Sequence, residues 1–235
     1  MIFKKRLNLL IKSIKLNKNF CIKYIIILFF LSYNYGKNNF FIINFFNSFI
    51  SLIVVFIYGW FVHYISHNVN FYSFYKKTII HKFLKEKCSY LDKIFLFINK
   101  HHCDFHDKVH HNKKINKNIY NLIKESFQNI LSISISLILI NNLCDLNLNN
   151  LVILSYGLLY SSVHNINYNL KKNKNHELHH KNKFTNYGID FIDIIFDTKY
   201  NKKLEDLNED SNNLNYIYFL LVICKNLKLL NFLNI

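Results

Sequence analysis

Residues 40–62 read FFIINFFNSFISLIVVFIYGWFV, and His63-Tyr-Ile-Ser-His67 follows directly. An almost continuously apolar run of this length fits a helix that crosses a bilayer, which takes ~20 residues. Two histidines four residues apart share one face of a helix, so both imidazoles can reach one point. The stretch therefore predicts an apolar helix that carries a pair of candidate metal ligands to its end.

Three further apolar stretches cover residues 21–33, 130–140 and 151–163. Each is marginal as a membrane span by itself and needs its flanks, or it sits shallowly as part of a helical hairpin. A last apolar run, residues 216–223, is too short to span and is expected to be an interfacial or buried helix. We expect an all-α integral membrane protein with about four transmembrane or membrane-embedded helices and a cytosolic, histidine-rich helical cap.

Lysine placement predicts the orientation of these helices. Residues 4–23 are rich in lysine and also contain Arg6, so the N-terminus is expected to be cytosolic. Alternate crossings then bring His63 and the later histidines back to the cytosolic surface, and leave Cys144 and Asp145 in a loop on the far side. Both termini and all histidine clusters are expected on the cytosolic side.

Composition argues against two other classes of protein. The formal net charge is +16, but the positive residues are scattered lysines, and Arg6 is the only arginine available to read guanine. We therefore expect no nucleic-acid partner. The five cysteines are an odd number without a CxxC pair, which is typical of ordinary thiols in a reducing compartment.

Twelve histidines lie between His63 and His180, most of them in three clusters. The second cluster is His106-Asp-Lys-Val-His110-His111, and the third is His176-Glu-Leu-His179-His180. Imidazole is the commonest protein ligand for iron, zinc and copper. Three clusters exceed what one zinc ion needs, and they indicate two metal ions held almost entirely by histidine.

The third cluster is followed by Asn186-Tyr187-Gly188 and then by Asp193. Asn and Gly favour a turn with positive φ, which can fold the chain back so that Asp193 approaches the imidazoles. A carboxylate that accepts a ring N–H would orient a ligand histidine and raise its basicity. The alternative is that Asp193 only caps a helix.

Together these motifs resemble the fatty acid hydroxylase superfamily, which includes sterol desaturases and sphingolipid or fatty acid hydroxylases. The resemblance covers about residues 57–199, and His164 is similar to an extra histidine that follows the last membrane helix of such proteins. It implies a helical membrane protein with a di-iron centre in a cytosolic cap. The ligands would be His63, His67, His106, His110, His111, His164, His176, His179 and His180, supported by Asn186, Tyr187 and Asp193.

The resemblance also implies an activity, in which O2 is the co-substrate and a lipid C–H bond is hydroxylated or desaturated. Electrons would come from a separate donor such as cytochrome b5 and its reductase, and the protein would reside in the endoplasmic reticulum. The middle cluster has one residue more than the usual spacing, which leaves the lipid open. The expected organisation is a basic cytosolic segment over 1–19, a membrane-embedded catalytic domain over 20–200, and a polar tail with a short apolar helix over 201–235.

Two other functions fit part of the pattern. His176-Glu177-Leu-His179-His180 contains H-E-x-x-H, so a membrane zinc metalloprotease would use His176 and His180 as ligands and Glu177 as general base. The surrounding lysines are unlike the apolar helix in which membrane-embedded proteases carry this motif, and the other two clusters would be unexplained. The second alternative is a non-catalytic membrane protein that binds or transports metal, although its histidines would be expected within the spans.

Overall fold

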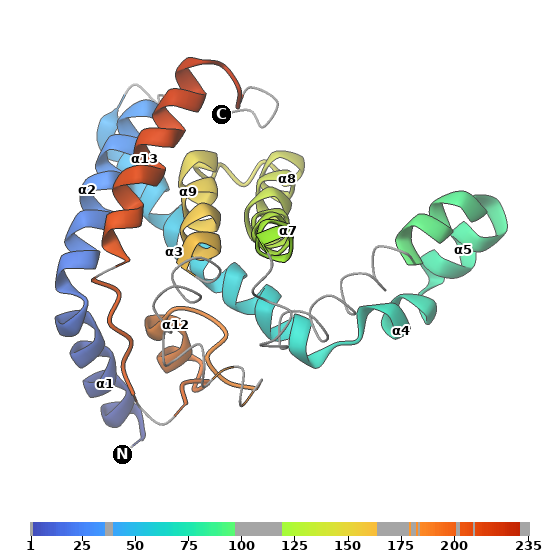
Figure 1. The fold of residues 1–235 in the computed structure, drawn as a ribbon, viewed down its shortest axis with the longest axis horizontal. Coiled ribbons are helices and arrows are strands. Elements are labelled where there is room, and N and C mark those ends of the chain that lie inside the picture. Colours follow the sequence, from blue (N-terminus) through green and yellow to red (C-terminus); the bar gives the residue numbers. More distant parts are fainter. Residues whose placement is uncertain are drawn as a thin grey trace.

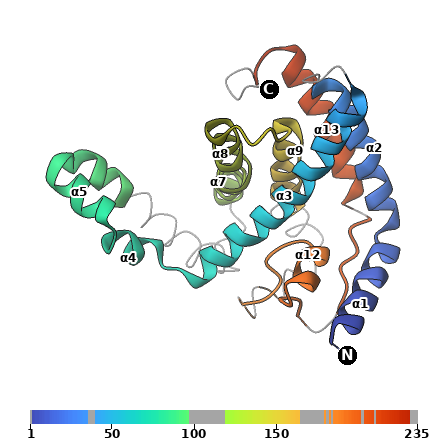
Figure 2. The same cartoon turned by 180° about the vertical axis from the view of Figure 1, so that it is seen from behind.

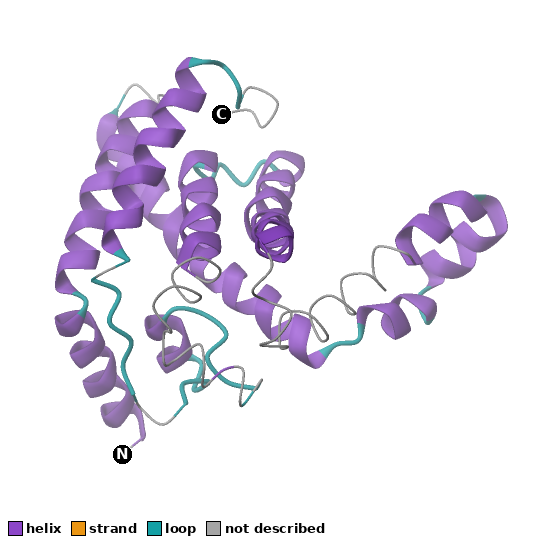
Figure 3. Cartoon of the chain, viewed as in Figure 1, coloured by secondary structure: helices purple, strands orange, loops and turns teal. Residues whose placement is uncertain are grey.

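The structure is a computed structural model, and it describes residues 2–35, 40–96, 119–163, 179, 182, 184–200, 203–208 and 210–230. All regular secondary structure in these residues is helical, and none of them belongs to a strand (Figure 3). The predicted all-α class is thereby confirmed. The helices are α1 Ile2–Leu16, α2 Lys18–Tyr35, α3 Phe41–Asn68, α4 Phe71–Lys76, α5 Ile79–Lys87, a helix over 89–96, α7 Ile119–Ile130, the π-helical η2 Leu131–Ile135, α8 Ser136–Cys144, α9 Asn150–Ser161, α12 Asp190–Ile195 and α13 Ser211–Asn226.

Helix α3 is the long apolar helix expected from residues 40–62. It continues through the histidine pair to Asn68, and its 28 residues include no Lys, Arg, Asp or Glu. The helix ends where Val69 becomes extended, and the side chain of Asn70 then caps α4 by accepting the N–H of Ser73 at 3.0 Å. The prediction that an apolar helix carries His63 and His67 to its end is confirmed.

Helices α7 and α8 form one uninterrupted helical run through the π-helical segment η2. This run, Ile119–Cys144, has 26 residues, because the flanks of the predicted stretch 130–140 extend it at both ends. Among the described residues it joins α3 as the second helix long and apolar enough to cross a membrane. Helix α9 is apolar but has only 12 residues. The described residues therefore contain two helices of membrane-spanning length and composition, whereas about four membrane-embedded helices were expected.

The π-helical segment packs unusually close to α9. Ser134 Oγ donates to the carbonyl of Ile153 at 2.7 Å, which ties the two helices together at a backbone position. A Cβ at Gly157 would lie 1.9 Å from Ser134 Oγ, so only glycine fits at this crossing. The wide π-helical turn at Ser134 therefore packs against Gly157, which has no side chain.

Helices α3 and α9 run in the same direction on either side of a common core. Near their starts, Asn149 donates its backbone N–H to Ser51 Oγ and its side-chain N–H to Ser48 Oγ, both at 2.7 Å. At their ends, the Tyr160 hydroxyl lies 3.0 Å from Nδ1 of His63. The end of α9 therefore lies against α3 at His63, and α12 lies below the end of α9 (Figure 1).

Helix α13 completes the bundle and places the chain ends apart. It starts beside the start of α2, where Lys23 Nζ donates to Ser211 Oγ at 2.9 Å, and it packs Leu214, Ile217 and Leu221 into the core. The predicted apolar C-terminal helix is thus a buried bundle helix. It ends at the opposite end of the bundle from α1 and α12, and the view from behind shows the same separation (Figures 1 and 2). The expected cytosolic location of both termini stays a prediction.

Candidate metal centre

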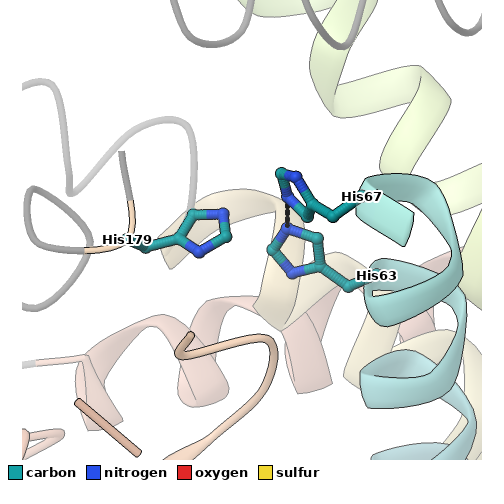
Figure 4. Close-up of side chains that lie close together, drawn as sticks. All are labelled: His63, His67 and His179. Carbon is teal, nitrogen blue, oxygen red and sulfur yellow. Dashed lines mark hydrogen bonds between the residues drawn. The ribbon is translucent and has the colours of Figure 1, made fainter. Parts of the chain in front are cut away.

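Three histidines from two of the predicted clusters converge at the end of α3. The nitrogens that His63, His67 and His179 can offer to a metal lie within 4.8 Å of one another. The Nε2 atoms of His63 and His67 are 3.1 Å apart, one helical turn along α3, and the ring of His179 approaches both from another segment (Figure 4). His63 and His179 are buried, and His67 is partly exposed.

The spacing of these nitrogens fits a transition metal. A nitrogen ligand binds zinc at ~2.0–2.1 Å, so two neighbouring ligands of one ion lie between ~2.8 Å apart in octahedral geometry and ~3.4 Å apart in tetrahedral geometry. The separation of 3.1 Å between His63 and His67 falls in this range. His179 offers a third nitrogen within 4.8 Å of theirs. The site can therefore hold a metal ion, and the donor set suits iron, zinc or copper alike.

The backbone selects the ring tautomers that metal binding needs. Nδ1 of His63 lies 2.7 Å from the carbonyl of Tyr187, and Nδ1 of His179 lies 2.6 Å from the carbonyl of Thr185. A carbonyl only accepts, so each Nδ1 carries the proton and donates it. Each Nε2 is then the nitrogen with the lone pair, which is the arrangement in which an outer acceptor orients a ligand histidine.

Asp193 holds the turn that supplies these carbonyls. Its carboxylate accepts the backbone N–H groups of Tyr187 and Gly188, each at 3.0 Å, and the hydroxyl of Thr198 at 2.6 Å. Burial raises the pKa of Asp193 to about 6, although these hydrogen bonds and the charge of Lys199 lower it. Asp193 therefore acts on His63 through the Tyr187 backbone, whereas the sequence predicted that a carboxylate would accept a ring N–H.

The predicted turn is present, and its first residue has the expected conformation. Asn186 has a φ of 54°, and its side-chain oxygen accepts the backbone N–H of Tyr200 at 3.0 Å. A Cβ at Gly188 would lie 3.3 Å from two atoms of Trp60, so glycine lets the turn approach α3. The Asn and Gly of the motif thus shape the backbone around Tyr187.

An aromatic wall joins α3 to α12 beside the histidines. The indole of Trp60 stacks on Phe196 with ring centroids 4.3 Å apart and on Tyr64 at 5.2 Å. Its Nε1 donates to Thr198 Oγ1 at 3.1 Å, and Thr198 in turn donates to Asp193. The same carboxylate therefore fixes both the turn under the histidines and the wall beside them.

Helix α1 anchors α12 from the other side. Asp190 is fully buried and accepts the Ser13 hydroxyl at 3.5 Å, the backbone N–H of Glu205 at 2.7 Å and the ammonium of Lys199. On the surface, Arg6 pairs with Asp197 at 2.5 Å. The buried bonds of Asp190 fix the segment that carries the turn, and the one from Ser13 makes the N-terminal helix part of the site's framework.

The remaining predicted ligands lie outside the described residues. This applies to the whole second cluster and to the predicted base of the protease alternative, so their roles remain predictions. His81, which the sequence left without a role, is paired with Asp92 at 2.7 Å in a separate place. The predicted ligands and the predicted base that lie outside the described residues are His106, His110, His111, His164, His176, Glu177 and His180.

Sequence reasoning missed two polar residues close to the centre. The Tyr160 hydroxyl reaches His63 from α9, and the buried Glu125 of α7 interacts electrostatically with Tyr160. The two helices touch there, because Ser161 Oγ donates to the carbonyl of Ser126 at 3.2 Å. Glu125 is the single carboxylate of the candidate span Ile119–Cys144, and this was the available signal, since such residues in membrane spans are rare without a function.

Comparison of the chain with protein-family models, curated proteins and solved structures found no match.

Proposed function

We propose that this protein is a membrane-embedded, metal-dependent lipid oxidase that uses O2 to hydroxylate or desaturate a lipid C–H bond at a histidine-held di-iron centre. The observation that carries the proposal is the meeting of His63, His67 and His179 at the end of α3. A helix of this length and apolar character can reach through a bilayer, so its end would place the imidazoles at the membrane surface. A lipid chain lying along α3 would then end beside them.

The chain's own residues would prepare this site in three ways. The carbonyls of Tyr187 and Thr185 hold His63 and His179 with Nε2 free of a proton, and Asp193 holds the backbone that carries Tyr187. The stacked Trp60 and Phe196 would supply an apolar surface on which a lipid chain could lie. Bound iron would supply the O2 chemistry, and the electrons would come from a separate donor such as cytochrome b5 with its reductase.

The second metal position is part of the proposal. A triad of imidazoles suffices for one ion, and the second cluster with His164, His176 and His180 would complete a pair, as in the resembling superfamily. The proposal further takes α2 and α9 as membrane-embedded, with the N-terminus and the histidines on the cytosolic side of the endoplasmic reticulum. The substrate would be a fatty acyl chain, a sphingolipid or a sterol.

The zinc protease is the weaker alternative because of the role it gives to His179. In H-E-x-x-H the ligands would be His176 and His180, and His179 would point elsewhere. His179 is instead the buried residue that faces both histidines of α3. An oxidase centre that draws ligands from all clusters accounts for this position.

Metal counting on detergent-purified protein, expressed with added iron, tests the proposal. We expect about two metal ions per chain by the di-iron hypothesis, a reduced count in His179→Ala, and an unchanged count in Glu177→Gln. Lipids from cells that express the wild type should contain an oxidised species missing from the His179→Ala cells. One zinc per chain that survives His179→Ala, together with a proteolytic activity lost in Glu177→Gln, would establish the protease instead.

A further inference from the structure

Residues 71–96 form a separate unit, here called the arm, which consists of α4, α5 and the helix over 89–96. Two residues, Val69 and Asn70, separate the arm from the end of α3. The arm extends sideways, away from α7, α8 and α9 (Figures 1 and 2). If α3 spans a membrane, its end fixes the start of the arm at the membrane–water boundary. The chemistry of the arm can therefore be compared with that of a bilayer surface.

The last two helices of the arm repeat one pattern. Residues 79–84 read IIHKFL and residues 90–95 read YLDKIF, so two apolar residues, one polar residue, one lysine and two apolar residues recur after eleven positions. The polar members bond to each other, with His81 Nδ1 2.7 Å from Asp92 Oδ1. The repeated polar position is thus the internal contact of the arm.

Tyr75 of α4 closes this internal contact. Its hydroxyl donates to Asp92 at 2.9 Å, and its ring stacks on Phe95 with centroids 5.8 Å apart. Tyr75 and Asp92 are buried, although the arm is small. Burial raises the pKa of Asp92, but the hydrogen bonds from His81 and Tyr75 and the nearby charges lower it overall, so Asp92 is a carboxylate at neutral pH.

The apolar members of both repeats are exposed, except for Leu84, which is partly buried. Ile79 is 84% exposed and Tyr90 is 73% exposed, and the residues that follow them at helical spacing are exposed as well. In a helical hairpin, apolar side chains such as these are usually buried between the helices. The exposed set is Ile79, Ile80, Phe83, Tyr90, Leu91, Ile94 and Phe95.

The exposed lysines give the arm a strong positive charge. It contains six lysines and two carboxylates, and one of the carboxylates is the buried Asp92. Lys82 and Lys93 hold equivalent positions in the two repeats, and both are exposed. Helices with exposed large apolar residues beside lysines bind in the plane of a bilayer, where the apolar side chains enter the headgroup region and the lysines meet anionic lipids.

We propose that the arm is a membrane-surface element, which lies on an anionic bilayer with the apolar members of both repeats inserted and Lys82 and Lys93 at the lipid headgroups. The occupant of this face is phospholipid, since net positive charge and apolar side chains occur together directly beyond a helix able to span a membrane. The inference rests on the proposed membrane location. It does not depend on the metal or on catalysis.

Site-directed fluorescence in lipid nanodiscs tests the proposal. In a full-length chain with its native cysteines replaced by serine, single cysteines at Ile80→Cys and Leu91→Cys carry the environment-sensitive dye NBD. The matched controls are Lys82→Cys and Lys93→Cys on the same helices, and Ile50→Cys marks the exposed face of α3. The quenchers are a lipid with a nitroxide near its headgroup and aqueous iodide.

In discs of phosphatidylcholine with phosphatidylserine, we expect severalfold stronger lipid quenching at positions 80 and 91 than at 82 and 93. We also expect the lipid quenching at 80 and 91 to weaken in pure phosphatidylcholine and in the double variant Lys82→Glu/Lys93→Glu, with no loss of metal in that variant. Equal quenching in both kinds of disc would overturn the role of anionic lipid.

Two further outcomes would overturn the proposal, and they have different meanings. If positions 80 and 91 stay open to iodide while position 50 is quenched by lipid, the arm is solvated and the membrane location stands. If positions 80 and 91 are shielded from iodide without lipid quenching, protein covers the face. Iodide quenching at position 50 would instead remove the membrane location itself, and with it the basis of the proposed function.

Discussion

The Nε2 atoms of His63 and His67 face each other across 3.1 Å at the end of α3. Without metal, two imidazoles in this position share one N–H···N hydrogen bond. With metal, both present their Nε2 atoms to one ion at a spacing that its ligands require. The pair is therefore arranged for an ion before it binds one.

Replacing His67 with alanine should remove metal while leaving the fold intact, because His67 is partly exposed and contributes little to the core. The loss in affinity should exceed the ~10–100-fold that removal of an outer hydrogen-bond partner costs. Metal per chain, measured by mass spectrometry after dialysis against a chelator, checks this. His81→Ala is the matched control, since its partner Asp92 lies in the arm. Equal metal content in both variants would refute the site.

Asp193→Asn should weaken metal binding although Asp193 forms no hydrogen bond to a ligand ring among the described contacts. The amide can accept one backbone N–H of the turn but not replace both carboxylate oxygens, so the Tyr187 carbonyl that orients His63 is held less firmly. We expect a ~10–100-fold lower affinity, measured by competition with a chromophoric chelator. Asp197→Asn is the control, because its exposed pair with Arg6 contributes little. An unchanged affinity in Asp193→Asn would show that the turn is rigid without its carboxylate.

The raised pKa of Asp193 should make the stability of the metal-free protein depend on pH. Its folded value is about 6, against 3.8 for the free side chain, so the folded state binds the proton more tightly. The resulting stabilisation is present below pH 3.8 and is lost as the pH rises through about 6, at most ~3 kcal/mol in all. Unfolding of wild type and Asp193→Asn should be compared between pH 3.8 and about 6. The contributions of other titrating groups are common to both proteins and cancel in the difference. The free energy of unfolding of the wild type, relative to that of Asp193→Asn, should rise as the pH falls from about 6 to 3.8. A constant difference would contradict the burial argument.

Gly157→Ala should destabilise the bundle, because the new Cβ would lie 1.9 Å from Ser134 Oγ and 2.8 Å from Ser134 Cβ. Separating η2 from α9 would cost ~1–3 kcal/mol. The measurement is the temperature of thermal aggregation in detergent. Ser134→Gly in the same chain removes the opposing side chain and should restore part of the loss. Destabilisation by Gly157→Ala without any rescue would place the clash elsewhere.

The sequence was sufficient for the elements that depend on local pattern. The apolar run before His63 allows little besides a long helix, and the helical period then brings His67 beside it. The Asn186 turn also follows from residue type alone, because few residues adopt a positive φ. These predictions needed no knowledge of how distant segments pack.

Other features depended on tertiary packing and could not be read from spacing. The meeting of His179 with α3 was expected only from the shared ligand chemistry of the clusters, since no local pattern links residues so far apart. The role of Asp193 was predicted only in outline, because a sequence does not show which way a carbonyl points. For α13, the sequence left open whether the helix is interfacial or buried, and the structure shows Leu214, Ile217 and Leu221 buried in the core.

The origin of the three imidazoles in two distant parts of the chain has a consequence for assembly. His63 and His67 are synthesised long before His179, so the triad exists only after the segment behind α9 has folded back onto α3. An ion bound by all three would close a loop of over a hundred residues and, like a disulfide, would remove conformational freedom from the unfolded chain. Metal insertion would then be the last step of maturation, and its completion would lock the segment that carries His179 to α3.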